Sequence, residues 1–146
     1  MPTRVRDSDM CDGFTQLMVS ASVKINRNLT STSREALEPK VRAAWIAMRE
    51  QVPGIACRSF KMPPPDDVFA FRYTVPSRTG DVDAWAKETV IFTDDVKPMR
   101  EAYRALLHEH YWLTSGDHYV AELHVSPSPD GWNFRSGTFI ASGTQS

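Results

Sequence analysis

The sequence has little that would suit a membrane or a nucleic acid. Its 17 Lys and Arg nearly balance its 18 Asp and Glu, which gives a formal net charge of -1 and no electrostatic attraction to polyanions. No window approaches the roughly 18 consecutive apolar residues that a membrane-spanning helix requires. We therefore expect neither a nucleic acid nor a membrane as a partner.

Cysteine, histidine and glycine are also sparse, and their spacing argues against several kinds of site. Cys11 and Cys57 lack the spacing of a metal-binding or redox pair, which indicates reduced thiols and a cytoplasmic protein. His108, His110 and His118 do not form a metal-ligand set, because side chains two residues apart lie on different sides of a helix and no cysteine or carboxylate completes the group. The seven glycines are scattered, so no phosphate-binding loop is expected. We predict no metal and no bound cofactor.

What is present suits one folded domain. The 146 residues are 41% hydrophobic and 24% charged, an ordinary globular composition. Residues 1–13 are charged and aperiodic and are expected to form a flexible N-terminal tail, while residues 141–146 are expected to form a polar C-terminal tail. The predicted single domain spans residues 14–140.

The hydrophobic pattern switches between strands and helices along the chain. Apolar residues alternate over residues 14–25, which predicts a strand. A helix is expected from Thr32, which would form a capping box with Glu35, to Val52, and Pro39 is expected to kink it or to delay its start. Further strands are expected over residues 55–60, 68–75, 89–92 and 120–125, and further helices over 81–88 and from the Asp pair at 94–95 to about 110. This order predicts an α/β or α+β fold, a mixed sheet with helices packed on one face.

The candidate site follows the apolar strand over residues 120–125. The Ser-Pro-Ser-Pro run at residues 126–129 is expected to end this strand, because proline cannot donate to a ladder. His124, Ser126 and Asp130 would then lie at the strand's end and in its loop, where α/β proteins commonly place ligand crevices. A nucleophilic site built from these three residues would lack the glycine-flanked elbow that exposes a catalytic serine.

Several short segments, taken in order, resemble a known family. They are the strand leading to Asn26, the helix with VRAAWIAMR at 41–49 that ends at Pro53, YTVP at 73–76, WAKET at 85–89, and ELHVS at 122–126 followed by Asp130-Gly131. Over about residues 15–137 the chain resembles the N-terminal half of a fungal acyltransferase related to chloramphenicol acetyltransferase and to the condensation domains of peptide synthetases. The resemblance implies a chloramphenicol-acetyltransferase-like half domain and acyl transfer to a hydroxyl or amine in secondary metabolism.

The resemblance also implies a His-His-x-x-x-Asp-Gly motif, whose second histidine is the general base and whose aspartate holds the geometry. If Asp130 and Gly131 end this motif, Val125 and Ser126 occupy the histidine positions, and neither is a base near neutral pH. The nearest imidazole is His124, which along a strand shares a face with Ser126 and not with Val125. The candidate catalytic residues are therefore His124 and Asp130, and the candidate substrate-binding residues are Ser126, Gly131 and Trp132.

The predicted function is that of an acyltransferase-like protein that is truncated, degenerate in its motif and inactive alone. Acyl-coenzyme A is the expected co-substrate, or else an acyl carrier protein, and a small molecule the expected acceptor. The alternative is a non-catalytic small-molecule-binding or regulatory module, whose crevice would be lined by Trp132, Phe134 and His124. A third interpretation is a shortened gene product with no selected role.

An incomplete fold would also expose apolar surface. Self-association, or pairing with a second acyltransferase domain, is therefore expected. The candidate contact residues are Trp112, Trp132, Phe134, Phe139 and Ile140. The last two could equally form one more strand of the sheet.

Overall fold

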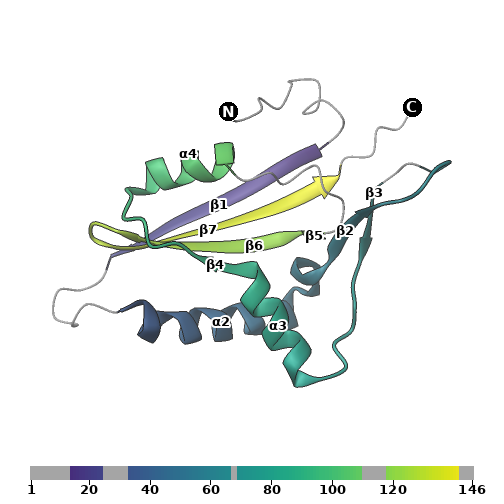
Figure 1. The fold of residues 1–146 in the computed structure, drawn as a ribbon, viewed down its shortest axis with the longest axis horizontal. Coiled ribbons are helices and arrows are strands. Elements are labelled where there is room, and N and C mark those ends of the chain that lie inside the picture. The colour runs from purple at the N-terminus through teal and green to yellow at the C-terminus, as the bar shows by residue number, and fades with distance from the viewer. Residues whose placement is uncertain (1–13, 25–32, 67–68, 110–117, 142–146) are drawn as a thin grey trace.

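The computed structural model describes residues 14–24, 33–66, 69–109 and 118–141 (Figure 1). The expected N-terminal tail and most of the expected C-terminal tail lie outside these residues. The described elements are β1 (Phe14–Lys24), α2 (Arg34–Gln51), the 3₁₀ helix η1 (Pro53–Ala56), β2 (Arg58–Lys61), β3 (Phe69–Arg72), α3 (Thr79–Thr89), β4 (Val90–Phe92), α4 (Met99–Glu109), β5 (His118–Tyr119), β6 (Ala121–Ser128) and β7 (Gly131–Ala141).

The larger sheet has four strands in the order β1-β7-β6-β4. β7 pairs antiparallel with β1 over its whole length, from Phe14 opposite Ala141 to Lys24 opposite Gly131. β6 and β7 form an antiparallel hairpin, whereas β4 runs parallel to β6. The sheet is therefore mixed, and the predicted fold class is confirmed.

A smaller sheet, in the order β3-β2-β5, lies at one end of the large sheet (Figure 1). Its strands are shorter than the alternating pattern predicted. The strand expected from Ile55 begins only at Arg58, because Val52 is followed by Pro53 and the chain makes a 3₁₀ turn there. β3 ends at Arg72, and the chain from 73 to 76 forms no ladder.

The longest helix, α2, differs at its start from the prediction. Ser33 is its N-cap, and the Ser33 hydroxyl accepts a hydrogen bond from the Ala36 amide at 3.4 Å. The cap expected at Thr32 is therefore one residue too early. α2 continues through Pro39, so the expected late restart does not occur. Its last residue is Gln51 and its C-cap is Val52, close to the predicted end.

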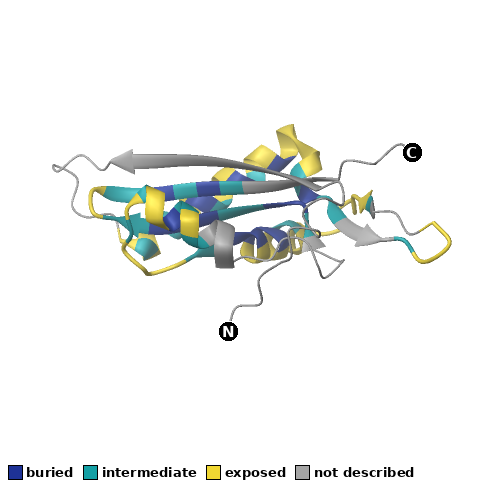
Figure 2. Cartoon of the chain, turned by 90° about the horizontal axis from the view of Figure 1, so that it is seen from above, coloured by how far each residue is buried: buried dark blue, intermediate teal, exposed yellow. Residues whose placement is uncertain are grey.

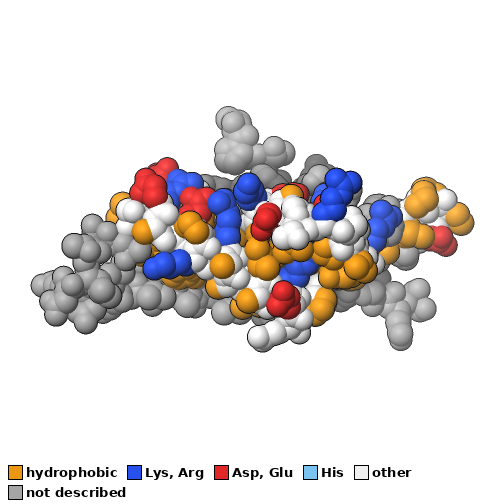
Figure 3. All heavy atoms as spheres, turned by 90° about the horizontal axis from the view of Figure 1, so that it is seen from below, with side chains coloured by type: hydrophobic (Ala, Val, Ile, Leu, Met, Phe, Trp, Pro, Cys, Tyr) orange, Lys and Arg blue, Asp and Glu red, His pale blue; other side chains and the backbone are white. Residues whose placement is uncertain are grey.

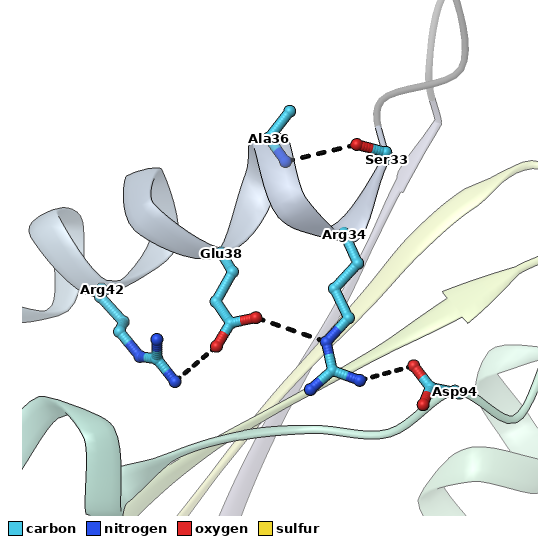
Figure 4. A network of polar contacts seen from close by, with 6 residues as sticks. All are labelled: Ser33, Arg34, Ala36, Glu38, Arg42 and Asp94. Atoms are coloured by element: carbon cyan, nitrogen blue, oxygen red, sulfur yellow. Dashed lines mark hydrogen bonds and ion pairs between the residues drawn. The ribbon is translucent and has the colours of Figure 1, made fainter.

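An ion-pair network joins the first turns of α2 to the chain after β4 (Figure 4). Glu38 pairs with Arg34 at 3.4 Å and with Arg42 on the next turn, and Arg34 also reaches Asp94 at 2.6 Å. Asp94 was expected to begin a helix, but α4 begins only at Met99. The Asp94 carboxylate instead pairs with an arginine of another element, which the local sequence does not reveal.

The hydrophobic core lies between the large sheet and two helices, α2 and α3. The rings of Trp45 and Trp85 are stacked, with centroids 5.8 Å apart, and they pack with apolar residues of β4 and β6. Figure 2 shows buried residues gathered where the strands meet the helices. In Figure 1 the helices lie on both sides of the strands, with α4 opposite α2 and α3 and in contact with β1 and β7. The fold class is as predicted, but the helices do not all pack on one face of the sheet. Within the described part of the chain, every helix is too short or too polar to cross a bilayer.

Candidate functional site

The strand that carries the candidate site is longer than the sequence predicts. β6 continues through Pro127 and ends at Ser128, inside the run at residues 126–129 that was expected to end it, so the strand extends further into this run than predicted. Pro127 is tolerated because its backbone edge points away from β7 and past the end of β4. There its carbonyl accepts a hydrogen bond from the Lys97 amide at 3.3 Å, and no ladder needs the missing N–H.

The hairpin separates the two candidate catalytic residues. His124 lies in the middle of β6 and is 5% exposed, whereas Asp130 is exposed in the turn between β6 and β7. From His124 to Ser128 alone the strand extends about 13 Å at roughly 3.3 Å per residue. A hydrogen bond between the two side chains is therefore out of reach in this conformation. Gly131, a candidate for substrate binding, begins β7 opposite Ser128.

The hairpin also places the candidate binding residues on opposite faces. Trp132 and Phe134 face the core, where Trp132 makes an edge-to-face contact with Phe92 at 6.5 Å. His124 and Ser126 point to the other face, because side chains alternate along a strand. The crevice expected between Trp132, Phe134 and His124 is therefore not formed, and that expectation is corrected.

The face opposite the core is buried and polar. Glu122, His124 and Ser126 of β6 share it, and the His124 Nε2 and Glu122 Oε2 atoms are 2.9 Å apart. A carboxylate in this position orients the imidazole ring and selects its tautomer. Ser126 is 2% exposed, so this hydroxyl is withdrawn from solvent.

Two further residues of this face come from β7, and the sequence analysis missed both. Asn133 is fully buried opposite Ser126, and its Nδ2 donates to the Lys97 carbonyl at 2.8 Å. Arg135 is 5% exposed opposite His124, and its guanidinium donates to the Ser126 hydroxyl at 3.0 Å. Burial lowers the pKa of the Arg135 guanidinium, because desolvation disfavours its charge.

A signal for these residues was present in the sequence. Asn133 and Arg135 alternate with Trp132 and Phe134, as polar residues alternate with apolar ones over 121–126. Such alternation indicates a strand with one polar face. The pairing of β6 with β7 is what brings the two polar rows together, and the sequence shows this pairing only if the Pro-Asp turn is recognised.

This arrangement suits hydrogen bonding to a polar group better than metal binding. Among the residues that the structure describes, no three His, Cys, Asp or Glu side chains form a group that could hold a metal ion. The polar face instead combines one carboxylate, one imidazole, one hydroxyl, one amide and one guanidinium. All five take part in a contact described above, but the Asn133 Oδ1 and Arg135 Nε atoms have no hydrogen-bond partner among the described residues.

No family model and no curated protein sequence matches this chain. Among solved structures, the TRI3 trichothecene 15-O-acetyltransferase of Fusarium sporotrichioides superposes with a TM-score of 0.57 at 12% identity, over 88% of this chain and 26% of that one. The chain has an acyltransferase-like fold. It spans about a quarter of the length of the TRI3 enzyme.

Two TRI101 structures, both described as complexes with coenzyme A and T-2 or T-2 mycotoxin, are more distant. The F. sporotrichioides protein has a TM-score of 0.46 at 9% identity, over 87% of this chain and 30% of that one. The F. graminearum protein has a TM-score of 0.43 at 13% identity, over 87% and 31%. At this distance the two comparisons add no support beyond the TRI3 match.

Proposed function

We propose that this chain is an acyltransferase-like protein that does not transfer acyl groups by itself. The observation that carries this proposal is the separation of His124, buried on β6, from Asp130, exposed in the hairpin turn. In an acyl transfer to a hydroxyl or amine, a base must lie within about 3 Å of the oxygen or nitrogen atom whose proton it removes. Nothing in the hairpin offers an imidazole oriented by Asp130.

His124 is the described imidazole closest to the degenerate motif, but its surroundings do not suit a general base. The ring is buried and its Nε2 atom is held by the Glu122 carboxylate. An acceptor hydroxyl would have to displace that carboxylate, or reach the ring through the cover of the polar face. Val125 and Ser126, at the positions where the resemblance places histidines, supply no base at all.

The proposal is tested by measuring release of free coenzyme A from acetyl-coenzyme A in the presence of a panel of alcohols and amines. We expect the rate with protein to equal the rate without it. His124→Ala and Asp130→Asn should give the same background rate. Turnover above background that is lost in His124→Ala would overturn the proposal and would identify His124 as the base.

Acyl-coenzyme A is the ligand that we propose for this chain, because TRI3, whose fold is similar, is an acetyltransferase. Binding and catalysis can be separated by calorimetric titration of coenzyme A. Heat of binding without turnover would support an acyltransferase-like protein that has kept a ligand but not the reaction. No observation favours the alternative of a crevice between Trp132, Phe134 and His124.

A further inference from the structure

Arg135 carries a buried charge with no described counter-charge. Its side chain is 5% exposed, its Nε atom has no hydrogen-bond partner within the described part of the chain, and its guanidinium donates to the neutral Ser126 hydroxyl at 3.0 Å. Desolvation is the cause of its lowered pKa, and no carboxylate among the described residues opposes it. Burying an ion without a partner is strongly unfavourable, because the charge loses its hydration without compensation.

The carboxylate of Glu122 on the same polar face lies 2.9 Å from the His124 ring. The guanidinium points the other way along β6, because it contacts Ser126, two residues from His124. A native protein seldom leaves a buried cation unopposed. The guanidinium is therefore suited to receive an anionic oxygen from outside the described residues.

A second buried atom with no partner lies at the same level of the sheet. Asn133 is fully buried, its Nδ2 donates to the Lys97 carbonyl, and its Oδ1 is a buried acceptor with no donor among the described residues. Asn133 lies directly opposite Ser126, and Cβ atoms of opposed residues are about 4.5–5.5 Å apart. The guanidinium on Ser126 and the Asn133 amide are therefore close enough to contact one small ligand.

We propose that Arg135 and Asn133 bind a small oxyanion that also carries a hydroxyl, such as a hydrogen phosphate group or an α-hydroxy acid. The anionic oxygen would accept from Arg135, and the hydroxyl would donate to the Asn133 Oδ1 atom. An oxyanion without a proton would place oxygen against oxygen at Asn133. This site does not depend on acyl transfer, and it lies on the face of the sheet opposite the hydrophobic core.

The discriminating pair of ligands is hydrogen phosphate and sulfate. Both are tetrahedral oxyanions, but near neutral pH only phosphate keeps a proton to donate. We expect phosphate to raise the urea midpoint of unfolding saturably, because a ligand that binds only the native state stabilises it. Sulfate at equal ionic strength should give no saturable rise. The same measurement with lactate, which carries a hydroxyl, and with acetate, which does not, tests the α-hydroxy acid. A saturable rise with phosphate alone or with lactate alone shows which of the two oxyanions binds.

Variants then locate the binding. Arg135→Met should abolish the phosphate response, whereas Arg100→Met, which removes an exposed charge from α4, should retain it. Asn133→Ser leaves the charge of Arg135 in place. It should weaken phosphate binding about tenfold or more, because the amide acceptor is lost. It serves as the test if Arg135→Met does not fold.

Either of two results would contradict the proposal. One is an equal response of the parent chain to phosphate and to sulfate, which is a general salt effect. The other is a phosphate response that survives intact in both Arg135→Met and Asn133→Ser, which would place any binding elsewhere.

Discussion

Trp45 links the two core helices through both its ring and its N–H group. It is 4% exposed and stacked on Trp85, and its Nε1 donates to the Thr89 hydroxyl at 2.9 Å. Thr89 donates in turn to the Trp85 carbonyl at 2.8 Å. Arg49, one turn along α2, lies 4.8 Å from the Trp85 ring centroid and adds a cation–π contact. One residue of α2 thus fixes the position of α3.

Replacing Trp45 by Ala should lower the free energy of unfolding by about 3–5 kcal/mol, the usual cost of truncating a buried aromatic. Trp45→Phe keeps most of the ring packing and loses the bond to Thr89, so its cost should be smaller. Urea denaturation followed by circular dichroism gives both values. A midpoint for Trp45→Ala within error of the parent would contradict the packing described for α2.

At the scale of elements, the first turn of α3 contains a carboxylate, that of Asp81, which accepts hydrogen bonds from the residues just before the helix. The Asp81 Oδ2 atom accepts hydrogen bonds from the Ser77 hydroxyl, the Ser77 amide and the Arg78 amide, each at 3.0 Å. The Ser77 hydroxyl and the two amides lower the pKa of Asp81 below the ordinary value of 3.8, because they favour the ionised form. Asp81 is exposed, so its effect on stability is modest.

This shift gives the contribution of Asp81 a definite pH dependence. Because the folded-state pKa lies below the unfolded one, the stabilisation is present above the unfolded value of 3.8 and is lost as the pH falls through the folded value. Asp81→Asn should therefore reduce the acid sensitivity of the urea midpoint below about pH 4. Asp83→Asn on the same helix is the matched control. Identical acid profiles for the parent and Asp81→Asn would refute the assignment.

Elements set by local pattern were predictable, and elements set by distant neighbours were not. Alternation over residues 14–25 and helical spacing after Ser33 gave β1 and α2 to within one or two residues. The path of β6 through Pro127 depends on where β4 ends, and local sequence carries no information about that. The same holds for the surroundings of the candidate site, because the partners of His124 and Arg135 follow from the register of the hairpin.

At the scale of the whole molecule, exposed apolar side chains gather near the C-terminal end of α2 and along the chain from β3 to α3. Figure 3 shows hydrophobic side chains in the middle of the face seen from below. Tyr73 belongs to this region, because Arg49 lies 5.5 Å from its ring centroid. The most exposed large residues there are Met48, Val52, Phe71, Tyr73 and Val75.

The contact residues expected from the sequence are different. Trp132 and Phe134 are partly buried against the core, so they do not form a free surface. Phe139 and Ile140 belong to β7, which agrees with the alternative of one more strand. Trp112 lies outside the described residues. The proposed association surface therefore moves to the region around β3.

Self-association should be weakened by a charge placed in this region. Val75 is 75% exposed, and we expect Val75→Asp to shift the protein toward monomer in sedimentation at micromolar concentration and to reduce binding of a hydrophobic dye. Val96, which is 63% exposed between β4 and α4, provides the control Val96→Asp. A parent protein that sediments as a monomer and binds no dye would refute the association.

The pairing of β1 with β7 has a consequence for how the chain acquires its structure during synthesis. The partner of Lys24 is Gly131 and the partner of Phe14 is Ala141, more than a hundred residues later. β1 therefore leaves the ribosome long before its only described partner strand exists. Contacts of such high sequence separation slow folding, because the chain loses the entropy of closing the loop before the strand pairing stabilises it. While translation proceeds, β1 must wait as an unpaired apolar segment, and a chaperone that binds extended hydrophobic peptides would find its target there first.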